Sequence, residues 1–406
     1  MDAARRLGID LTVASDHRST FEAAQPANLL YIDCDTPARL TGQVRRFAAA
    51  HPVAAVFGVD DGTAVAAAVA AEALGLPHNP ALACDIARNK PRQRATLARA
   101  GVPVPAFGLH RFDADIDAVA RATRFPCVIK PTHLAMSRGV MRVDDPADLA
   151  KAVKRLRAIA TSAGTPPEGR ETFLVEEYVA GDEFAVEGLL DGGTLRVLAL
   201  FDKPDPLVGP FYEETIYSTP SALAAAEQAT IASLVERAAR AIGLTRGPVH
   251  AEVRLNERGP WIIEVAARPI GGRCGSVLRF GEQGMVSLEQ LLLAHALGLT
   301  VDGQPLTADA AAGRRPLTIH REPLAAAVMM VPMPRAGRLI EVRGVDEARR
   351  VPWIDDVVIT AHPGQQLEPL PEGNTYLGFI FARATTAPTC VAAVRAAHAK
   401  LRAELE

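Results

Sequence analysis

The clearest alternation of apolar and polar positions lies on either side of a polar turn, NERGP, at residues 256–260. Side chains along a strand point to opposite faces in turn, so this period of two predicts a β-hairpin over residues 250–272. Because Pro260 has no amide hydrogen for a strand ladder, we place it in the turn. A five-residue turn then sets Glu252 directly opposite Glu264 across the two strands.

Two carboxylates that face each other across a strand pair repel, and a protein tolerates this when a cation lies between them. Such oxygen ligands, with few other protein donors, suit Mg²⁺ that arrives with a phosphate, which makes Glu252 and Glu264 candidate metal ligands. Arg268 lies on the same side, where it could meet developing negative charge, and His250 shares the face of Glu252. The alternative is a surface hairpin with two unrelated acids, because a register shift of one residue would send them to opposite faces.

The remaining pattern predicts an α/β protein. Over residues 1–80, short apolar runs alternate with helical runs, which is typical of βα units with a parallel sheet. We expect strands at residues 9–13, 52–59, 125–130, 141–143, 173–179, 183–190 and 195–201. We expect helices at residues 62–74, 81–100, 148–160, 221–242 and 287–297. The chain opens on a helix that ends at Gly8, whereas such a domain usually opens on a strand, so we expect either a trimmed chain or an upstream gene start.

Composition and charge narrow the class of protein. With 406 residues the chain is long enough for two or three domains, and 49% apolar and 22% charged residues are ordinary for a soluble globular protein. The net charge of −3 gives no reason to expect nucleic acid, and the absence of any run of about 18 apolar residues excludes a spanning helix. The five cysteines are scattered without CxxC pairs, which favours reduced thiols in the cytoplasm over disulfides or a zinc site.

Four further segments carry candidate chemistry. ARNKPRQRATLARAGVPVP contains Lys90 and FPCVIKP contains Lys130, and both lysines are point charges suited to phosphate oxygens. The loop after Lys130, through Ser137, can lend backbone amides to phosphates. LVEEYVAGDEF and IIEVAARPIGG follow in that order. Each segment alone is weak evidence, but together, over roughly residues 81–300, they resemble the ATP-grasp superfamily, and EVAARPIGG resembles its L-amino-acid ligase subgroup.

The resemblance implies an ATP-grasp fold, of the α/β (α+β) class, in four parts. These are a pre-ATP-grasp α/β domain at residues 1–80, a small lobe with the lysine-bearing strand at 81–170, a larger lobe with the metal hairpin at 171–300, and a C-terminal α+β domain at 301–406. Residues 316–406 could either cover the active site or build an interface. Family relatives are often dimers, so a homodimer is the assembly that the resemblance implies.

The resemblance also implies how LVEEYVAGDEF would bind the nucleoside of ATP. The backbone of Glu177 and Val179 would face the adenine edge. The Glu176 carboxylate would accept a hydrogen bond from the exocyclic amine of adenine, and Glu183 would hold the ribose hydroxyls.

At the hairpin, the resemblance assigns Glu252 and Glu264 to Mg²⁺ or Mn²⁺. It assigns Arg268, together with Lys130, to the negative charge of the transferring phosphoryl group. Many relatives carry an asparagine two residues after the second glutamate as a further metal ligand, but this chain has Ala266 there. We therefore expect a metal site with fewer protein ligands, and the number of metal ions stays open.

The implied activity is that of an ATP-dependent carboxylate–amine ligase with small, amino-acid-like substrates. A carboxylate attacks the γ-phosphorus to give an acylphosphate and ADP, and an amine then displaces phosphate to form an amide or dipeptide. Arg273 could bind a substrate carboxylate, and Glu213 or Glu214 a substrate ammonium or guanidinium, although each could also be an ordinary surface residue. His250 is a third candidate for contact with substrate, and the alternative is that it only orients Glu252. Two alternatives stay open: a purine-biosynthesis-type enzyme that activates formate or bicarbonate, and a nucleotide-binding regulator without catalysis.

Overall fold

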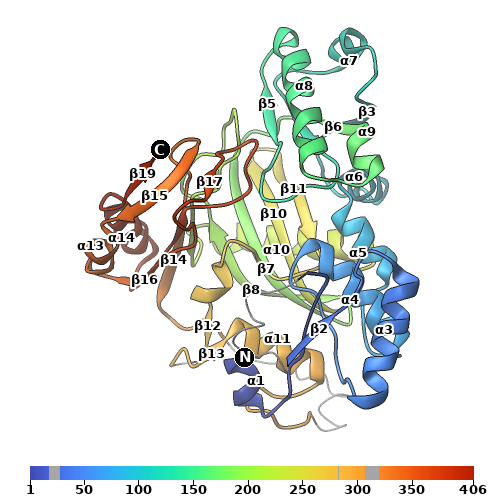
Figure 1. Ribbon diagram of the computed structural model, residues 1–406, viewed down its shortest axis with the longest axis vertical. Helices are drawn as coiled ribbons and strands as arrows, with labels where there is room; N and C mark the ends of the chain where they lie inside the picture. Colours follow the sequence, from blue (N-terminus) through green and yellow to red (C-terminus); the bar gives the residue numbers. More distant parts are fainter. Residues whose placement is uncertain (18–27, 282, 307–319) are drawn as a thin grey trace.

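The computed structural model describes residues 1–17, 28–281, 283–306 and 320–406. Its elements form an N-terminal α/β part, a small lobe, and a long central sheet that continues into the C-terminal part (Figure 1). In Figure 1 the small lobe stands at the top, the N-terminus lies at the lower centre, and helices α3 and α4 of the N-terminal part lie at the lower right. This arrangement confirms the mixed α/β class that the sequence predicts.

The described N-terminal part has two short parallel strands beside helices. Its elements are α1 (Asp2–Leu7), β1 (Val13–Ser15), β2 (Leu29–Tyr31), α3 (Pro37–Ala50) and α4 (Asp61–Ala73). α1 ends at Gly8, which has a left-handed φ of 66°, as predicted. The strand expected at residues 9–13 begins only at Val13, and the strand expected at 52–59 is wrong. The apolar pattern there has another cause, because Val56 packs into the buried cluster under α3 and α4.

Two short helices replace the single helix expected over residues 81–100. α5 (Ala81–Arg88) and α6 (Lys90–Arg99) meet at Asn89. The Asn89 side chain accepts a hydrogen bond from the Arg92 amide at 3.1 Å and so caps α6. This break places Lys90 at the first position of α6, at the edge of the cavity described below.

The small lobe is a four-stranded antiparallel sheet in the order β3-β6-β4-β5. Its elements are β3 (Phe107–Arg111), α7 (Ile116–Ala122), β4 (Cys127–Pro131), β5 (Met141–Val143), α8 (Pro146–Ser162), α9 (Pro167–Glu171) and β6 (Thr172–Glu177). Buried Leu149 and Leu156 of α8 pack with Ile129 and Val175 of the sheet. The sequence boundary at residue 170 assigns β6 to the larger lobe, whereas its pairing with β3 and β4 puts it in the small one.

The central sheet has eight antiparallel strands in the order β11-β10-β7-β8-β9-β14-β18-β16. The strands are β7 (Asp182–Asp191), β8 (Thr194–Asp202), β9 (Ile216–Thr219), β10 (Gly247–Asn256), β11 (Gly259–Ala266), β14 (Ala325–Val331), β16 (Ile354–Ile359) and β18 (Gly378–Ala384). α10 (Ala225–Ile242) buries Val235 and Ala238 against Val186 and Val249 of the sheet. The C-terminal part therefore extends the central sheet through β14, β18 and β16.

Smaller elements complete the described chain. They are η2 (Cys274–Val277), β12 (Arg279–Phe280), β13 (Val286–Ser287), α11 (Leu288–Leu297), β15 (Gly337–Arg343), α13 (Val345–Arg349), β17 (Gln366–Leu367), α14 (Ala387–His398) and β19 (Arg402–Leu405). α14 packs against β14 and β18. Among the described helices, none is long and apolar enough to cross a bilayer.

The predicted hairpin is formed by β10 and β11, and its two acids face each other. Glu252 pairs with Glu264, as predicted. The turn is shorter than expected, because Asn256 already pairs with Gly259 and Pro260 lies within the ladder. A β-bulge next to Glu252 absorbs the difference of one residue. Pro260 is tolerated in the ladder because β11 is an edge strand of the sheet.

Candidate active site

A cavity of about 140 Å³ lies between the small lobe and the central sheet. Its wall contains all of the predicted site residues except Arg273 and Glu213. They are Lys90, Lys130, Ser137, Glu176, Glu177, Val179, Glu183, Glu214, His250, Glu252, Glu264 and Arg268. Met330 and Tyr376 add a wall from the C-terminal part of the chain. Of the two roles left open for that part, the structure thus supports a contribution to the active-site cover.

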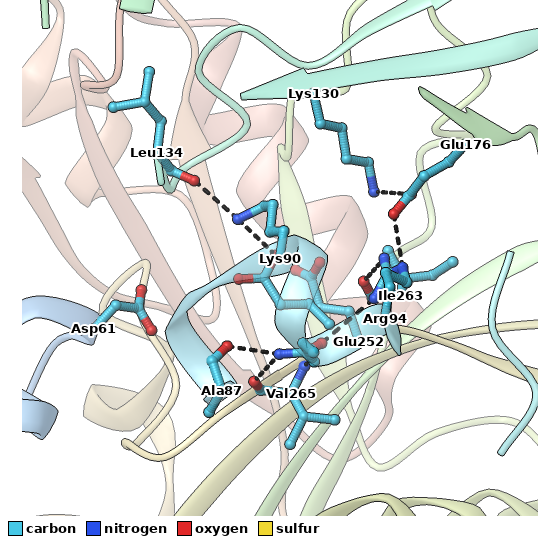
Figure 2. Close-up of polar contacts among 12 residues, drawn as sticks. Asp61, Ala87, Lys90, Arg94, Lys130, Leu134, Glu176, Glu252, Ile263 and Val265 are labelled. Atoms are coloured by element: carbon cyan, nitrogen blue, oxygen red, sulfur yellow. Dashed lines mark hydrogen bonds and ion pairs between the residues drawn. The ribbon is translucent and has the colours of Figure 1, made fainter. Parts of the chain in front are cut away.

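The cationic end of the cavity is formed by residues that the capped helix α6 and the strand β4 position. Lys130 Nζ lies 2.7 Å from Glu176 Oε2, and Arg94 Nε lies 2.7 Å from the other oxygen of Glu176 (Figure 2). Burial alone would raise the pKa of Glu176, but the charges of Arg94 and Lys130 lower it to about 2. Lys90 Nζ donates to the Leu134 carbonyl at 2.9 Å, which ties it to the loop after β4.

A buried arginine organises the end of the cavity where the sequence predicts the nucleoside. Arg254 donates to the Val179 carbonyl at 2.7 Å and to the Leu207 carbonyl at 2.6 Å. Its Nε lies 2.9 Å from Glu183 Oε2. Arg254 Cζ also lies 5.3 Å from the centre of the Tyr178 ring. We did not predict this role, although the alternation of the hairpin places Arg254 on the face of Glu252.

The acids of the cavity are neutralised by a lysine that sequence reasoning missed. Lys203 follows β8, and its Nζ lies 2.7 Å from Glu183, 2.7 Å from Glu214 and 3.1 Å from Glu252. Burial alone would lower the pKa of Lys203, but the three carboxylates hold it well above its usual range. Burial and the neighbouring carboxylates raise the pKa of Glu252 to about 8 despite this lysine. No motif marks Lys203, because its partners come from separate strands and a loop.

Arg268 is held by a residue from the N-terminal part. Its Nε and Nη2 each lie 2.9 Å from a carboxylate oxygen of Asp61, in a bidentate pair. Burial alone would lower the pKa of Arg268, but Asp61 raises it. Glu264 lies 3.5 Å from Lys90 Nζ, so the two facing acids of the hairpin are served by different lysines. Sequence reasoning missed Asp61 because 207 residues separate it from its partner.

The three predicted substrate residues occupy different surroundings. His250 is fully buried, which lowers its pKa to about 3, so its imidazole is neutral at pH 7. Glu214 accepts from the Tyr217 hydroxyl at 2.6 Å as well as from Lys203. Arg273 lies outside the cavity wall, and its guanidinium is 5.7 Å from the Phe379 ring centre.

The loop after Lys130 is fastened to the C-terminal part. The Gly139 amide donates to the Pro371 carbonyl at 2.9 Å, and Arg138 Nε donates to the Glu372 carbonyl at 2.7 Å. Arg155 holds the Glu372 carboxylate at 2.6 and 2.8 Å. In the loop itself Ser137 adopts a left-handed φ of 55° and reaches the cavity wall. This fastening keeps the loop over the lysines.

The donor set is suited to a divalent cation. Glu183, Glu214 and Glu252 offer oxygen atoms that lie within 4.8 Å of one another, and Glu264 faces Glu252 across the hairpin. Hard oxygen ligands of this kind are those of Mg²⁺ and Mn²⁺. The cavity thus brings together lysines, acids and an arginine, a set of side chains suited to phosphate oxygens, a metal ion and developing negative charge. A small lobe beside a larger antiparallel sheet, with such a cavity between them, is an arrangement suited to a nucleotide.

Comparison with known proteins identifies which such arrangement this is. The family described as "ATP-grasp domain" matches residues 123–277, "ATP-grasp N-terminal domain" matches 1–78, and "L-amino acid ligase C-terminal domain 2" matches 329–406. The chain therefore contains ATP-grasp domains, followed by a segment that matches the C-terminal domain of L-amino acid ligases.

Three relatives illustrate the similarity. A crystal structure of L-amino acid ligase from Bacillus licheniformis superimposes with a TM-score of 0.82 at 27% identity, covering 100% of this chain and 95% of that one. D-alanine–D-alanine ligase B of Chromobacterium violaceum is 29% identical over 52% of this chain and 67% of its own length. Alanine–anticapsin ligase of Bacillus subtilis is 29% identical over 54% of this chain and 50% of its own length.

Proposed function

We propose that this protein is an ATP-dependent ligase that joins the carboxylate of one amino-acid-like substrate to the amine of another, with release of ADP and phosphate. The observation that carries the proposal is that Lys90, Lys130 and Arg268 line the same cavity as Glu252 and Glu264. The similarity to L-amino acid ligase and to D-alanine–D-alanine ligase supports peptide-bond formation as the reaction.

In this proposal the small lobe and the edge of the central sheet bind ATP together. The backbone of Glu177 and Val179 faces adenine, and Glu183 holds the ribose. The phosphates lie between Lys90 and Lys130, beneath the loop that carries Ser137. Glu252 and Glu264 would hold Mg²⁺ or Mn²⁺, which would supply positive charge to the phosphates when bound.

The first half-reaction activates the carboxylate. One of its oxygens forms a bond to the γ-phosphorus, and the bond between that phosphorus and the leaving oxygen of ADP breaks. Negative charge develops beside Arg268 as the acylphosphate forms. Asp61 holds the guanidinium of Arg268 in position through two hydrogen bonds. The protein contributes position and charge, and no side chain bonds covalently to the substrate.

The second half-reaction requires that an amine reaches the acylphosphate before water does. The amine nitrogen bonds to the acyl carbon, phosphate leaves with the bonding electrons, and the amine loses a proton. The loop fastened by Glu372 and the side chain of Tyr376 close the cavity on that side. The carboxylate of Glu214 lines the cavity, where it suits the ammonium form of the incoming amine.

The proposal is tested by measuring ADP release over a matrix of amino acids, each offered as acid and as amine, with formate and bicarbonate as further acids. We expect ADP release that depends on the pair, and an amide product by mass spectrometry. Glu264→Gln should lower the rate by about 100-fold or more. Glu257→Gln, in the exposed turn of the same hairpin, should leave the rate unchanged. Tight ATP binding without pair-dependent ADP release would refute the proposal, and release stimulated by formate or bicarbonate alone would favour the purine-type alternative.

A further inference from the structure

Lys203 lies beneath the acids of the cavity, and its ammonium is fully paired with them. Its side chain is 3% exposed, and its ammonium lies within 3.1 Å of oxygens from Glu183, Glu214 and Glu252. An ammonium group has three hydrogens to donate, so these carboxylates use all of them. Lys203 therefore has no donor left for a substrate or a phosphate, and its contribution must act through the acids that it holds.

The three acids come from different elements and converge on one point. Glu183 is the second residue of β7, Glu214 lies in the loop before β9, and Glu252 lies on β10. Their oxygens lie within 4.8 Å of one another, which is close enough for one divalent ion to bind all three. In this structure the ammonium of Lys203 occupies the position between them.

The other acid of the hairpin has a looser cationic partner. Glu264 lies 3.5 Å from Lys90, and that lysine donates its hydrogen bond to the Leu134 carbonyl and not to the acid. The side of the acids that faces Lys90 and Lys130 is therefore less tightly paired than the side that faces Lys203. A metal ion that approached with nucleotide phosphates would meet Glu264 and Glu252 from this side.

We propose that Lys203 is a built-in cation that closes the cluster of Glu183, Glu214 and Glu252 to free divalent metal, so that Glu252 takes up a metal ion only together with a nucleotide. This inference rests on the metal role proposed for Glu252. Lys203 is a positioning residue, because it touches the acids and not the reacting groups. Without it, three buried carboxylates would face one another with no cation between them. A divalent ion could then supply the missing positive charge.

The test is binding of Mn²⁺ alone to the full-length protein, followed through the electron paramagnetic resonance signal of free Mn²⁺. The wild type should bind Mn²⁺ weakly without nucleotide and more tightly with ADP. Lys203→Met should bind one Mn²⁺ without nucleotide about tenfold more tightly than the wild type, whereas Lys203→Arg, which keeps the charge, should resemble the wild type. Lys151→Met removes an exposed lysine and controls for net charge; it should also resemble the wild type.

A second pair of variants keeps the test decisive if Lys203→Met does not fold. Glu214→Gln and the double variant Lys203→Met/Glu214→Gln contain the same two remaining acids and differ only in the lysine. The double variant should bind Mn²⁺ more tightly than Glu214→Gln. Equal affinities in the folded pair, or in wild type and Lys203→Met, would overturn the inference. A gain in Mn²⁺ affinity without ADP release by any substrate pair would refute the proposed ligase activity and leave the role of Lys203 standing.

Discussion

Replacement of Glu176 by glutamine tests how the cationic end of the cavity is held together. Both carboxylate oxygens are in use, with Arg94 and Lys130 each 2.7 Å away, and the two cations are 1% and 10% exposed. Glutamine has nearly the same shape but no charge, and its NH₂ group must point at one of the cations. The substitution therefore leaves two buried cations without an anion.

The magnitude follows from the acidity of Glu176. Its pKa falls from the ordinary 4.5 to about 2 because Arg94 and Lys130 outweigh the effect of burial. At about 1.4 kcal/mol for each pH unit, this difference corresponds to roughly 3 kcal/mol in favour of the ionised group at pH 7. Breaking a buried ion pair by removing one partner costs about 3–5 kcal/mol in other proteins, so we expect Glu176→Gln to lower the free energy of unfolding by about 3 kcal/mol.

Urea unfolding at pH 7, followed by circular dichroism, measures this change. Glu171→Gln is the matched control, because Glu171 pairs with Arg111 at 3.1 Å on the surface, where both side chains are more than half exposed. The control should lose less than about 1 kcal/mol. An unfolding midpoint for Glu176→Gln no lower than that of Glu171→Gln, at an unchanged denaturant slope, would refute the view that Glu176 neutralises the two cations.

Three further predictions concern other contacts of the cavity. Asp61→Asn should lower the kcat of ADP release about tenfold with little change in the KM for ATP, because it weakens the charged pair that aims Arg268. Arg254→Met should instead raise the KM for ATP about tenfold with a smaller effect on kcat, because Arg254 holds the Val179 carbonyl; steady-state kinetics separates the two outcomes. His250 has a pKa lowered to about 3, so its contribution to stability is full above pH 6.5 and falls as the pH drops toward 3. Urea midpoints should therefore show that the change from pH 7 to pH 5 costs the wild type about 2 kcal/mol more than His250→Asn; equal costs would contradict the buried, neutral imidazole.

Much of the site was predictable because it lies on regular strands. The alternation over β10 and β11 predicts that Glu252 faces Glu264, and the register confirms it. The turn from which we derived that register was wrong, because we placed Pro260 in the turn and it lies in the ladder. The shorter turn and the β-bulge offset each other by one residue. An edge strand tolerates proline, but no local signal shows which strand of a sheet lies at the edge.

Contacts between distant parts of the chain were not predictable in the same way. Asp61 is the first residue of α4, and an acidic residue at that position is explained equally well by its favourable interaction with the helix dipole. Lys203 stands in a proline-rich segment without periodicity, and its three partners are joined only by the pairing of separate elements. The strand expected at residues 52–59 was wrong for a different reason. An apolar run can be buried under helices without pairing to another strand.

Several cations in and beside the cavity are paired with acids of the protein. The pairs are Lys130 with Glu176 at 2.7 Å, Arg268 with Asp61 at 2.9 Å, Lys203 with Glu183 and Glu214 at 2.7 Å, and Lys90 with Glu264 at 3.5 Å. We therefore expect a phosphate group to bind by exchange with these acids and not by filling an open positive site. The electrostatic gain on phosphate binding is the difference between the new pairs with phosphate and the present pairs with the acids. This gain is smaller than the number of lysines suggests.

The weakest of these pairs determines where the exchange begins. Lys90 and Glu264 are 3.5 Å apart, which is beyond the usual length of a charged hydrogen bond, so Lys90 can turn to a phosphate at the least cost. That turn leaves Glu264 without a cation, opposite Glu252, whose own lysine stays in place. A divalent ion that accompanies the phosphates restores the balance at that point. Nucleotide and metal are therefore expected to bind as one unit, because each removes the charge imbalance that the other creates.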